Sequence, residues 1–289
     1  MAHSHSHSSE KIGWAFFLNF GFTIIEFIGG WLTNSTAIMA DAVHDLGDTL
    51  SIGSAWLLNK LGTKSATKEF TYGYRRLSLL GALINGIVLI VGSAWILYEA
   101  VPRLSKPEMP ETEGMIVLAI LGVLVNGFAA YKLHGGKSLN EKVLNWHLLE
   151  DVLGWVAVLI VAIVMQFKDW PVLDPVLSIG FTLFILFNVI RNLVSTVKLF
   201  FQASPDNSLL QNVTDRLLEL DAVSDLHHLH IWSLDGEHHV ATVHVVSQFE
   251  SKAEYLELKE SVSNALQEFE LSHTTIEIEL TSEECRNAD

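Results

Sequence analysis

Six long apolar stretches restrict the possible folds of this chain more than any other feature of its sequence. Most of them reach the ~20 residues that an α-helix needs to cross the hydrocarbon core of a bilayer, which is about 30 Å thick. They cover residues 14–32, 36–58, 77–100, 114–133, 148–167 and 173–199. The backbone inside a bilayer must satisfy its own hydrogen bonds, so the pattern predicts six transmembrane helices.

Lysine and arginine are distributed unevenly over the segments that connect these stretches. Nine lie on the side of the N-terminus: Lys11, Lys60, Lys64, Lys68, Arg75, Arg76, Lys132, Lys137 and Lys142. Three lie on the other side: Arg103, Lys106 and Lys168. Because cytoplasmic loops carry the excess of basic residues, the asymmetry predicts that both termini are cytoplasmic.

The charge changes sharply after Ser204 and Pro205. Of the 33 acidic and 18 basic residues, positions 205–289 hold 18 and 4, which leaves 15 and 14 for the positions before them. A nucleic-acid-binding domain would need a basic surface, so this acidic and His-rich segment excludes that class and suits cations instead. We therefore predict a six-helix membrane domain at 12–203 and a separate cytoplasmic domain at 204–289.

The periodicity of the tail predicts helices at 207–220 and 252–269 and strands at 223–233, 238–248 and 274–280. Asp235 and Gly236 form a hairpin turn signal between the first two strands. The order α-β-β-α-β predicts a small α+β domain in which helices cover one face of a sheet, with Leu256 and Val262 among the inward side chains. At the other end of the chain, residues 1–11 alternate His3, His5 and His7 with serine and are expected to be disordered.

The same spacing of ionisable residues, His-x-x-x-Asp, occurs inside one apolar stretch and at the start of another. The pairs are His44 with Asp48 and His147 with Asp151. Positions i and i+4 lie on one face of a helix, so each helix presents an imidazole and a carboxylate in one direction. Two such helices face to face supply the two nitrogens and two oxygens of a tetrahedral zinc site. The alternative is a hydrogen-bond network inside the membrane without metal.

Further polar residues at membrane depth are costly and each requires a reason. Asp41 shares the face of the first pair and is a candidate for the second shell or for the cation path, or else a helix-end carboxylate in water. Asp45 and Glu150 are weaker candidates for the same roles, because they do not share the exact helical register of the His–Asp pairs. A last group is expected to bond between helices: Asn19, Glu26, Asn85 and Asn126.

The predicted site indicates a mechanism. Imidazole binds metal only when it is neutral, so metal and protons compete, and the site can exchange zinc for protons across a membrane. The sequence contains no ATP-binding motif of the form Gly-x-x-x-x-Gly-Lys-Ser/Thr. It also lacks His-Glu-x-x-His, which argues against an intramembrane zinc protease, and we expect no enzymatic function. Its one cysteine, Cys285, excludes a disulfide framework and any Cys-based zinc site, and it is expected to be a bystander thiol.

Several motifs resemble the zinc-transporting branch of the cation diffusion facilitator family, from about residue 12 to residue 280. They are Asp41-Ala-Val-His-Asp-Leu-Gly-Asp48, Tyr72-Gly-Tyr-Arg-Arg76, Gly81-Ala-Leu-Ile-Asn85, Asp174-Pro175, Ala203-Ser-Pro205 and His230-Ile-Trp232. The resemblance implies a homodimeric, proton-coupled zinc exporter of the bacterial inner membrane. It also implies a ferredoxin-like or metallochaperone-like fold for the tail.

The same resemblance implies zinc sites in the cytoplasmic domain. On the first two strands the matching residues are His228 and His244, and the last strand offers Glu277 and Glu279 where relatives can have a histidine and an aspartate. Nearby alternatives are His227, His230, His238 and His239. A solvated polar strand face without metal is the competing interpretation.

Two other functions remain open. One is export of cadmium, cobalt or iron by the same mechanism, although His44 favours zinc over manganese or iron. The other is a membrane-anchored zinc sensor or scaffold, for which one or two helices without ionisable groups would suffice.

Overall fold

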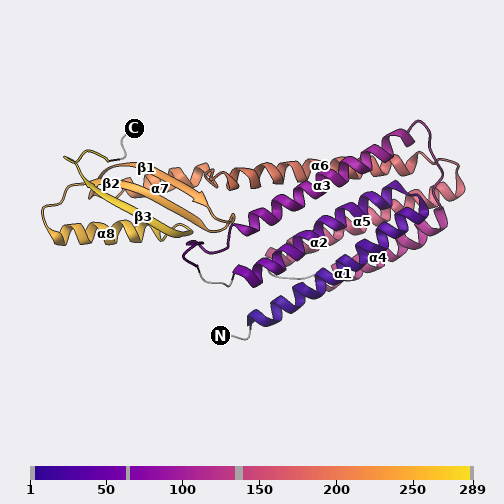
Figure 1. The fold of residues 1–289 in the computed structure, drawn as a ribbon, viewed down its shortest axis with the longest axis horizontal. Coiled ribbons are helices and arrows are strands. Elements are labelled where there is room, and N and C mark those ends of the chain that lie inside the picture. The colour runs from indigo at the N-terminus through magenta and orange to yellow at the C-terminus, as the bar shows by residue number, and fades with distance from the viewer. Residues whose placement is uncertain (1–3, 63–65, 134–138, 287–289) are drawn as a thin grey trace. The chain divides into compact units, whose positions relative to one another are not determined.

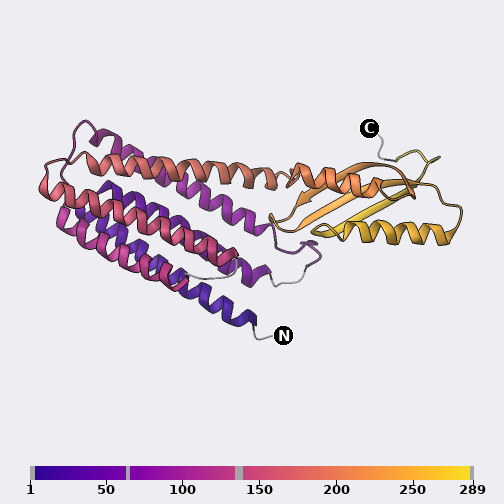
Figure 2. The same ribbon diagram turned by 180° about the vertical axis from the view of Figure 1, so that it is seen from behind.

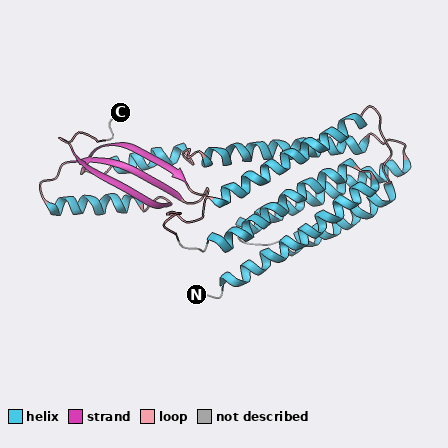
Figure 3. Ribbon diagram, in the orientation of Figure 1, coloured by secondary structure: helices cyan, strands magenta, loops and turns pink. Residues whose placement is uncertain are grey.

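The computed structural model describes residues 4–62, 66–133 and 139–286 of the chain. The chain divides into two compact units. One comprises Met1–Leu61 and Gly81–Leu193, and the other comprises Gly62–Leu80 and Val194–Asp289. The first unit is helical, and the second contains a sheet (Figure 3).

Long helices α1 to α6 run lengthwise beside one another in the first part of the chain (Figures 1 and 2). Their bounds are α1 Ser4–Thr33, α2 Thr36–Gly62, α3 Leu77–Arg103, α4 Thr112–Leu133, α5 Leu139–Phe167 and α6 Leu173–Phe200. Helix α1 thus begins inside the segment 1–11 for which the sequence predicts disorder.

Among the described residues, five helices are long and apolar enough to cross a membrane: α1, α3, α4, α5 and α6. Helix α2 is not one of them. It is 27 residues long, but it carries Asp41, Asp45 and Asp48. Composition therefore identifies five of the six predicted spans, and the sixth stays a prediction.

Close helix packing in this unit depends on small residues. Gly122 of α4 lies against the indole of Trp155 in α5, and a Cβ at Gly122 would come within 2.2 Å of that ring. Trp155 is 1% exposed and belongs to a core that α2, α4 and α5 share, with Ile38, Met115 and Val158. This core holds α2 and α5, the two helices with the His-x-x-x-Asp pairs, in one packed group.

The N-terminus of α2 is tied to the N-terminus of α6 through Asp174. The Asp174 carboxylate, 1% exposed, accepts hydrogen bonds from Ser35 Oγ at 2.5 Å, from Thr36 N and Thr36 Oγ at 2.7 Å each, and from Ala37 N at 3.2 Å. Ser35 Oγ in turn accepts a hydrogen bond from Ile38 N at 3.2 Å, as an N-cap side chain does. The anion also complements the positive end of the helix dipole.

The tail contains α7 (Asn207–Leu218), β1 (Val223–Ser233), β2 (His239–Ser247), α8 (Lys252–Leu266) and β3 (Leu271–Leu280). This is the predicted α-β-β-α-β order. The strands form one sheet in the order β1-β2-β3, with β1 and β2 antiparallel and β2 and β3 parallel (Figure 3). Its core includes Val213 and Leu217 of α7, Val243 of β2, and Leu258 and Val262 of α8. The prediction for Leu256 was wrong: this residue is 52% exposed, and Leu258 takes the inward position.

A bulge interrupts the pairing of β1 with β2. The register shifts between His227 and His230, and the intervening His228 has a positive φ of 49°. A bulge reorients the side chains of a strand relative to strict alternation. As a result the side chain of His227 lies on the same face of the sheet as that of His228. His244, which pairs with His227, is the third histidine on this face.

Candidate functional site

The two His-x-x-x-Asp pairs meet in the structure. His147 Nε2 lies 3.0 Å from Asp48 Oδ2, so the imidazole of α5 contacts the carboxylate of α2. In the opposite direction, His44 Nε2 lies 3.7 Å from Asp151 Oδ1. Within each helix the His–Asp separations are 3.7 Å in α2 and 3.8 Å in α5. The two rings lie 5.7 Å apart, nearly perpendicular to each other.

These distances agree with the dimensions of a zinc site. Zn–N and Zn–O bonds of ~2.0–2.1 Å in a tetrahedron place neighbouring ligand atoms about 3.3–3.4 Å apart. The four His–Asp separations of 3.0–3.8 Å lie on both sides of this value. Donor atoms of His44, Asp48 and His147 all lie within 4.8 Å of one another. Asp151 approaches the two histidines through different oxygens, His44 through Oδ1 and His147 through Oδ2.

A cavity of about 520 Å³ opens onto this group. Its lining comes from four helices and includes all four residues of the two pairs, together with Asp41, Ser51, Asn85, Glu150, Gly154, Phe181 and Asn188. The Asn85 amide donates to Ser51 Oγ at 2.8 Å, an α3-to-α2 contact in the wall. The side chains of His44, Asp48 and His147 are 24–32% exposed, and that of Asp151 is 10% exposed. Water in the cavity can therefore reach the group.

The three additional carboxylates are not equivalent. Asp41 and Glu150 line the cavity, and Asp41 is 7% exposed. Asp45 does not line it. It lies on the side of α2 that packs on α1, where the Asn19 amide donates to the Asp45 backbone oxygen at 3.2 Å and to Thr49 Oγ1 at 3.0 Å. Asn19 thus bonds between helices as expected, whereas neither oxygen of Glu26 accepts a hydrogen bond from the described residues.

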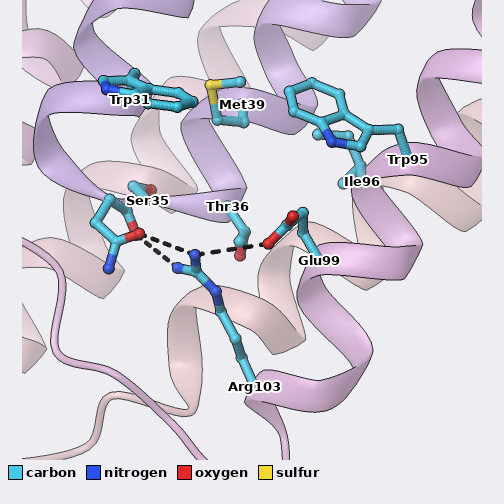
Figure 4. A pocket seen from close by; sticks show the side chains of 10 residues that line it. Trp31, Ser35, Thr36, Met39, Trp95, Ile96, Glu99 and Arg103 are labelled. Carbon is cyan, nitrogen blue, oxygen red and sulfur yellow. Dashed lines mark hydrogen bonds and ion pairs between the residues drawn. The ribbon is translucent and has the colours of Figure 1, made fainter.

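A second cavity of about 270 Å³ has a different character (Figure 4). Its polar end is the Arg103 guanidinium, which donates to Asn34 O at 2.9 Å and to Asn34 Oδ1 at 2.8 Å and lies 3.9 Å from Glu99. Trp31 and Trp95 form its apolar end. Its charged groups are engaged with one another and its lining contains no imidazole, so it does not resemble a divalent metal site.

The tail brings a separate group of potential ligands together beside the bulge of β1. Donor atoms of His227, His244, Glu279 and Cys285 all lie within 4.8 Å of one another. His244 Nδ1 is 2.6 Å from Glu279 Oε1 and 3.5 Å from Cys285 Sγ, and His227 Nε2 is 3.0 Å from Glu279 Oε2 without hydrogen-bond geometry. Two imidazoles, a carboxylate and a thiol form a donor set that zinc accepts.

The cluster agrees with the sequence-based candidates in part. His244 and Glu279 belong to it, and the ring of His228 lies 5.1 Å from that of His244. Glu277 lies 3.6 Å from His244 but also pairs with Arg286 at 2.6 Å. His230 lies at the margin, 6.2 Å from His228, and His239 is five residues from His244, about 17 Å along the strand.

Glu279 is held as an anion in this cluster. Burial opposes its ionisation, but hydrogen bonds with His244 and Cys285 and the nearby His227 ring outweigh it and keep the pKa of Glu279 below its ordinary value. The sequence-based expectation that Cys285 is a bystander and that no cysteine takes part in a zinc site needs correction, because the structure brings this thiol to two imidazoles and a carboxylate. Its one signal was position: the cysteine follows a strand rich in Glu by a few residues, so the chain can fold back onto that strand.

Comparison with known proteins places these features in a family. The profile of the cation efflux transmembrane domain matches residues 14–201, and that of the cation efflux protein cytoplasmic domain matches residues 205–281. The chain is 32% identical to the zinc transporter ZitB of Escherichia coli K12, over 96% of this chain and 93% of ZitB. It is 33% identical to the metal cation efflux system protein CzcD of Cupriavidus metallidurans, over 99% and 92%.

A third relative is the cadmium, cobalt and zinc/H(+)-K(+) antiporter of Bacillus subtilis strain 168. Its identity is 31% over 100% of this chain and 95% of the relative. The two profiles cover both units of the structure, and the relatives match over nearly their whole length. The match to these proteins therefore extends over both the helical membrane domain and the α+β domain. The chain belongs to the cation diffusion facilitator family of cation transporters.

Proposed function

We propose that this protein is a secondary active transporter that exports zinc from the cytoplasm in exchange for protons. The metal is held by His44, Asp48, His147 and Asp151. The single observation that carries the proposal is that two imidazoles and two carboxylates from α2 and α5 converge at 3.0–3.8 Å on an open cavity among apolar helices. No catalytic step is part of this function.

The chemistry of the four ligands supports exchange rather than passive passage. An imidazole has to lose a proton before its nitrogen binds metal, so occupancy by zinc and by protons exclude each other. Two carboxylates balance the charge of a divalent cation, and protons can balance them when the cation leaves. The relative from Bacillus subtilis carries an antiport mechanism in its name, which supports the same principle here.

Two alternatives differ in cargo or in class. Relatives named for cadmium and cobalt support a broader metal range, and iron is a further candidate, but two nitrogen donors in a four-ligand set favour zinc. A membrane-anchored zinc sensor or scaffold would not need a donor group on a cavity between helices. We therefore favour transport.

In this proposal α2 also crosses the membrane and brings the number of spans to six. Its aspartates are tolerated because they face the cavity and neighbouring helices rather than lipid. Residues 12–203 form the transport domain, and 204–289 form a cytoplasmic regulatory and dimerisation domain. Both termini are cytoplasmic, as the distribution of lysine and arginine favours. The relatives compared are bacterial, which supports a bacterial inner membrane as the location.

The tail is proposed to bind zinc as a regulator. Residues 205–289 carry 18 acidic and 4 basic side chains, so two copies in a homodimer repel each other. Zinc at His227, His244, Glu279 and Cys285 neutralises part of this charge and joins β1, β2, β3 and the C-terminal segment. We expect zinc to stabilise the domain and to draw the two copies together.

Zinc uptake into proteoliposomes under an imposed pH gradient tests the proposal. Purified protein should accumulate zinc only when the gradient is present, and the Asp48→Ala variant should not, because its site keeps three ligands and one less negative charge. The matched control is Asp169→Ala, an exposed carboxylate between α5 and α6, which should transport as the wild type does. Near wild-type flux in Asp48→Ala at low zinc would refute the assignment of the site.

A further inference from the structure

Glu26 is the most deeply buried carboxyl group among the described residues of the helical unit. Its side chain is 0% exposed, and neither carboxylate oxygen accepts a hydrogen bond from the described part of the chain. Burial of an ionised carboxylate is unfavourable unless a cation or several hydrogen-bond donors compensate. This residue is not one of the four proposed zinc ligands, and the transport chemistry described above makes no use of it.

The packing of α1 on α2 shows what Glu26 faces. Before it, Thr23 Oγ1 lies 3.3 Å from Thr49 Oγ1. After it, a Cβ on Gly30 would lie 2.7 Å from the sulfur of Met39. Glu26 is between these two contacts, so it faces the part of α2 between Met39 and Thr49. That part contains two further buried carboxyl groups, those of Asp41 and Asp45, which are 7% and 6% exposed.

The strongest electrostatic influences on Glu26 all come from carboxyl groups: Asp45 and Asp41 of α2 and Asp151 of α5. Among them Asp45 acts on Glu26 most strongly. Buried carboxyl groups that face one another in this way cannot all ionise, so the cluster needs a bound cation. Glu26, whose oxygens accept no hydrogen bond from the described residues, is the place for it.

The surroundings favour a proton over a metal ion as that cation. Asp41 lines the cavity of the zinc ligands, but Glu26 does not. Sodium or potassium would need room and a shell of oxygen ligands, whereas a proton needs neither. Asp41 also leaves its buried Oδ2 without a hydrogen-bond partner among the described residues, and it borders both the cavity and Glu26. A proton therefore has an acidic intermediate between Glu26 and the water of the cavity.

We propose that Glu26 is a proton-carrying site of the exchange, separate from the metal ligands. It holds a proton while the transport site is free and releases it when a divalent cation binds beside Asp151. The added positive charge stabilises the Glu26 carboxylate, and the proton leaves by way of Asp41 to water. The reverse sequence reloads the site on the other side of the membrane. This inference rests on the proposed zinc/proton exchange and assigns it one specific proton.

The full-length protein with Glu26→Gln tests the inference, since the amide has nearly the shape of a protonated carboxyl but cannot release a proton. We measure the protons released on zinc binding in weakly buffered detergent solution, together with zinc transport in proteoliposomes. The variant should release about one proton fewer per protomer than the wild type. Zinc uptake driven by a pH gradient should be lost, while exchange of zinc for zinc at equal pH continues.

The control is Glu113→Gln, the same change at an exposed position in the first turn of α4, which should release and transport as the wild type does. Failure of the wild type itself to couple zinc to the pH gradient would refute the proposed function. A coupled wild type with an unchanged proton count in Glu26→Gln would overturn the inference alone. In another outcome, Glu26→Gln releases as many protons as the wild type but no longer responds to a potassium gradient that drives zinc uptake by the wild type. This result would also overturn the inference, because the site would then hold potassium.

Glu26→Asp covers the case in which Glu26→Gln does not assemble. It retains a carboxyl group but withdraws it by one methylene from Asp45. We expect it to keep the proton count and the coupling and to shift the pH at which the proton is released. A pH dependence of proton release identical to that of the wild type would show that the proton is held elsewhere.

Discussion

Replacement of Asp174 by asparagine should destabilise the helical unit strongly, although Asp174 binds the start of α2 and not the metal ligands. The carboxylate accepts four hydrogen bonds at 2.5–3.2 Å from three consecutive residues at the start of α2. Asparagine offers one acceptor oxygen, and its amide group would turn N–H donors toward the donors of α2. About half of these bonds would be lost, at the 1.5–3 kcal/mol that a hydrogen bond to a charged group contributes.

The expected loss is therefore about 3–5 kcal/mol of unfolding free energy, as for a broken buried polar network. For a chain of this size it corresponds to a fall of roughly 6–20 °C in the thermal midpoint. Thermal unfolding in detergent, followed by tryptophan fluorescence, measures it. Asp169→Asn, an exposed position five residues earlier, is the matched control. A midpoint equal to that of the control would refute the inference that Asp174 joins α2 to α6.

Three further predictions concern the metal sites and the tail. His44→Asp should broaden transport toward cadmium, manganese or iron, since it makes the ligand set harder; unchanged relative rates in proteoliposomes would remove His44 from the site. Cys285→Ser should lower the zinc affinity of the 205–289 domain, which has its own core, by about tenfold or more. It should also abolish the thiolate absorption of the cobalt-loaded domain, and an unaltered cobalt spectrum would exclude Cys285 as a ligand. Burial opposes the ionisation of Asp235, but N–H groups of His238 and Glu237 donate to it and hold its pKa below the usual value. The contribution of Asp235 to the free energy of unfolding is complete above about pH 3.9 and is lost as the pH falls through the lower folded pKa. Urea unfolding at pH 3 should show this loss. Asp235→Asn should reduce the dependence of the unfolding free energy on pH.

Local patterns in the sequence account for much of this fold. Hydropathy identifies the long helices because lipid-facing and core positions are both apolar, and the α-β-β-α-β order of the tail follows from periodicity and from the turn at Asp235 and Gly236. Composition is least informative for α2. That helix has to carry Asp41, Asp45 and Asp48 inside the bundle, and the same carboxylates lower its apparent tendency to span a membrane.

The tail cluster shows where sequence patterns are insufficient. Alternation along β1 places His228 and His230 on one face, but the bulge at His228 turns His227 toward His244 as well. A bulge depends on how two strands twist against each other, and one strand alone does not reveal it. Cys285 reaches the cluster because the chain folds back after β3, a tertiary contact without a local signal. From the sequence, Glu26 resembles a residue that bonds between helices, and only the structure shows that its oxygens accept no hydrogen bond from the described residues.

Anomalous diffraction at the zinc edge, from crystals of the full-length protein grown with zinc, tests the central claim most directly. We expect a peak among the four ligands in the helical unit, about 2.0–2.1 Å from the Nε2 atoms of His44 and His147 and from one oxygen each of Asp48 and Asp151. The peak should be absent from crystals of the Asp48→Ala variant. Zinc density confined to the tail of the wild-type protein, with none between α2 and α5, would contradict the account.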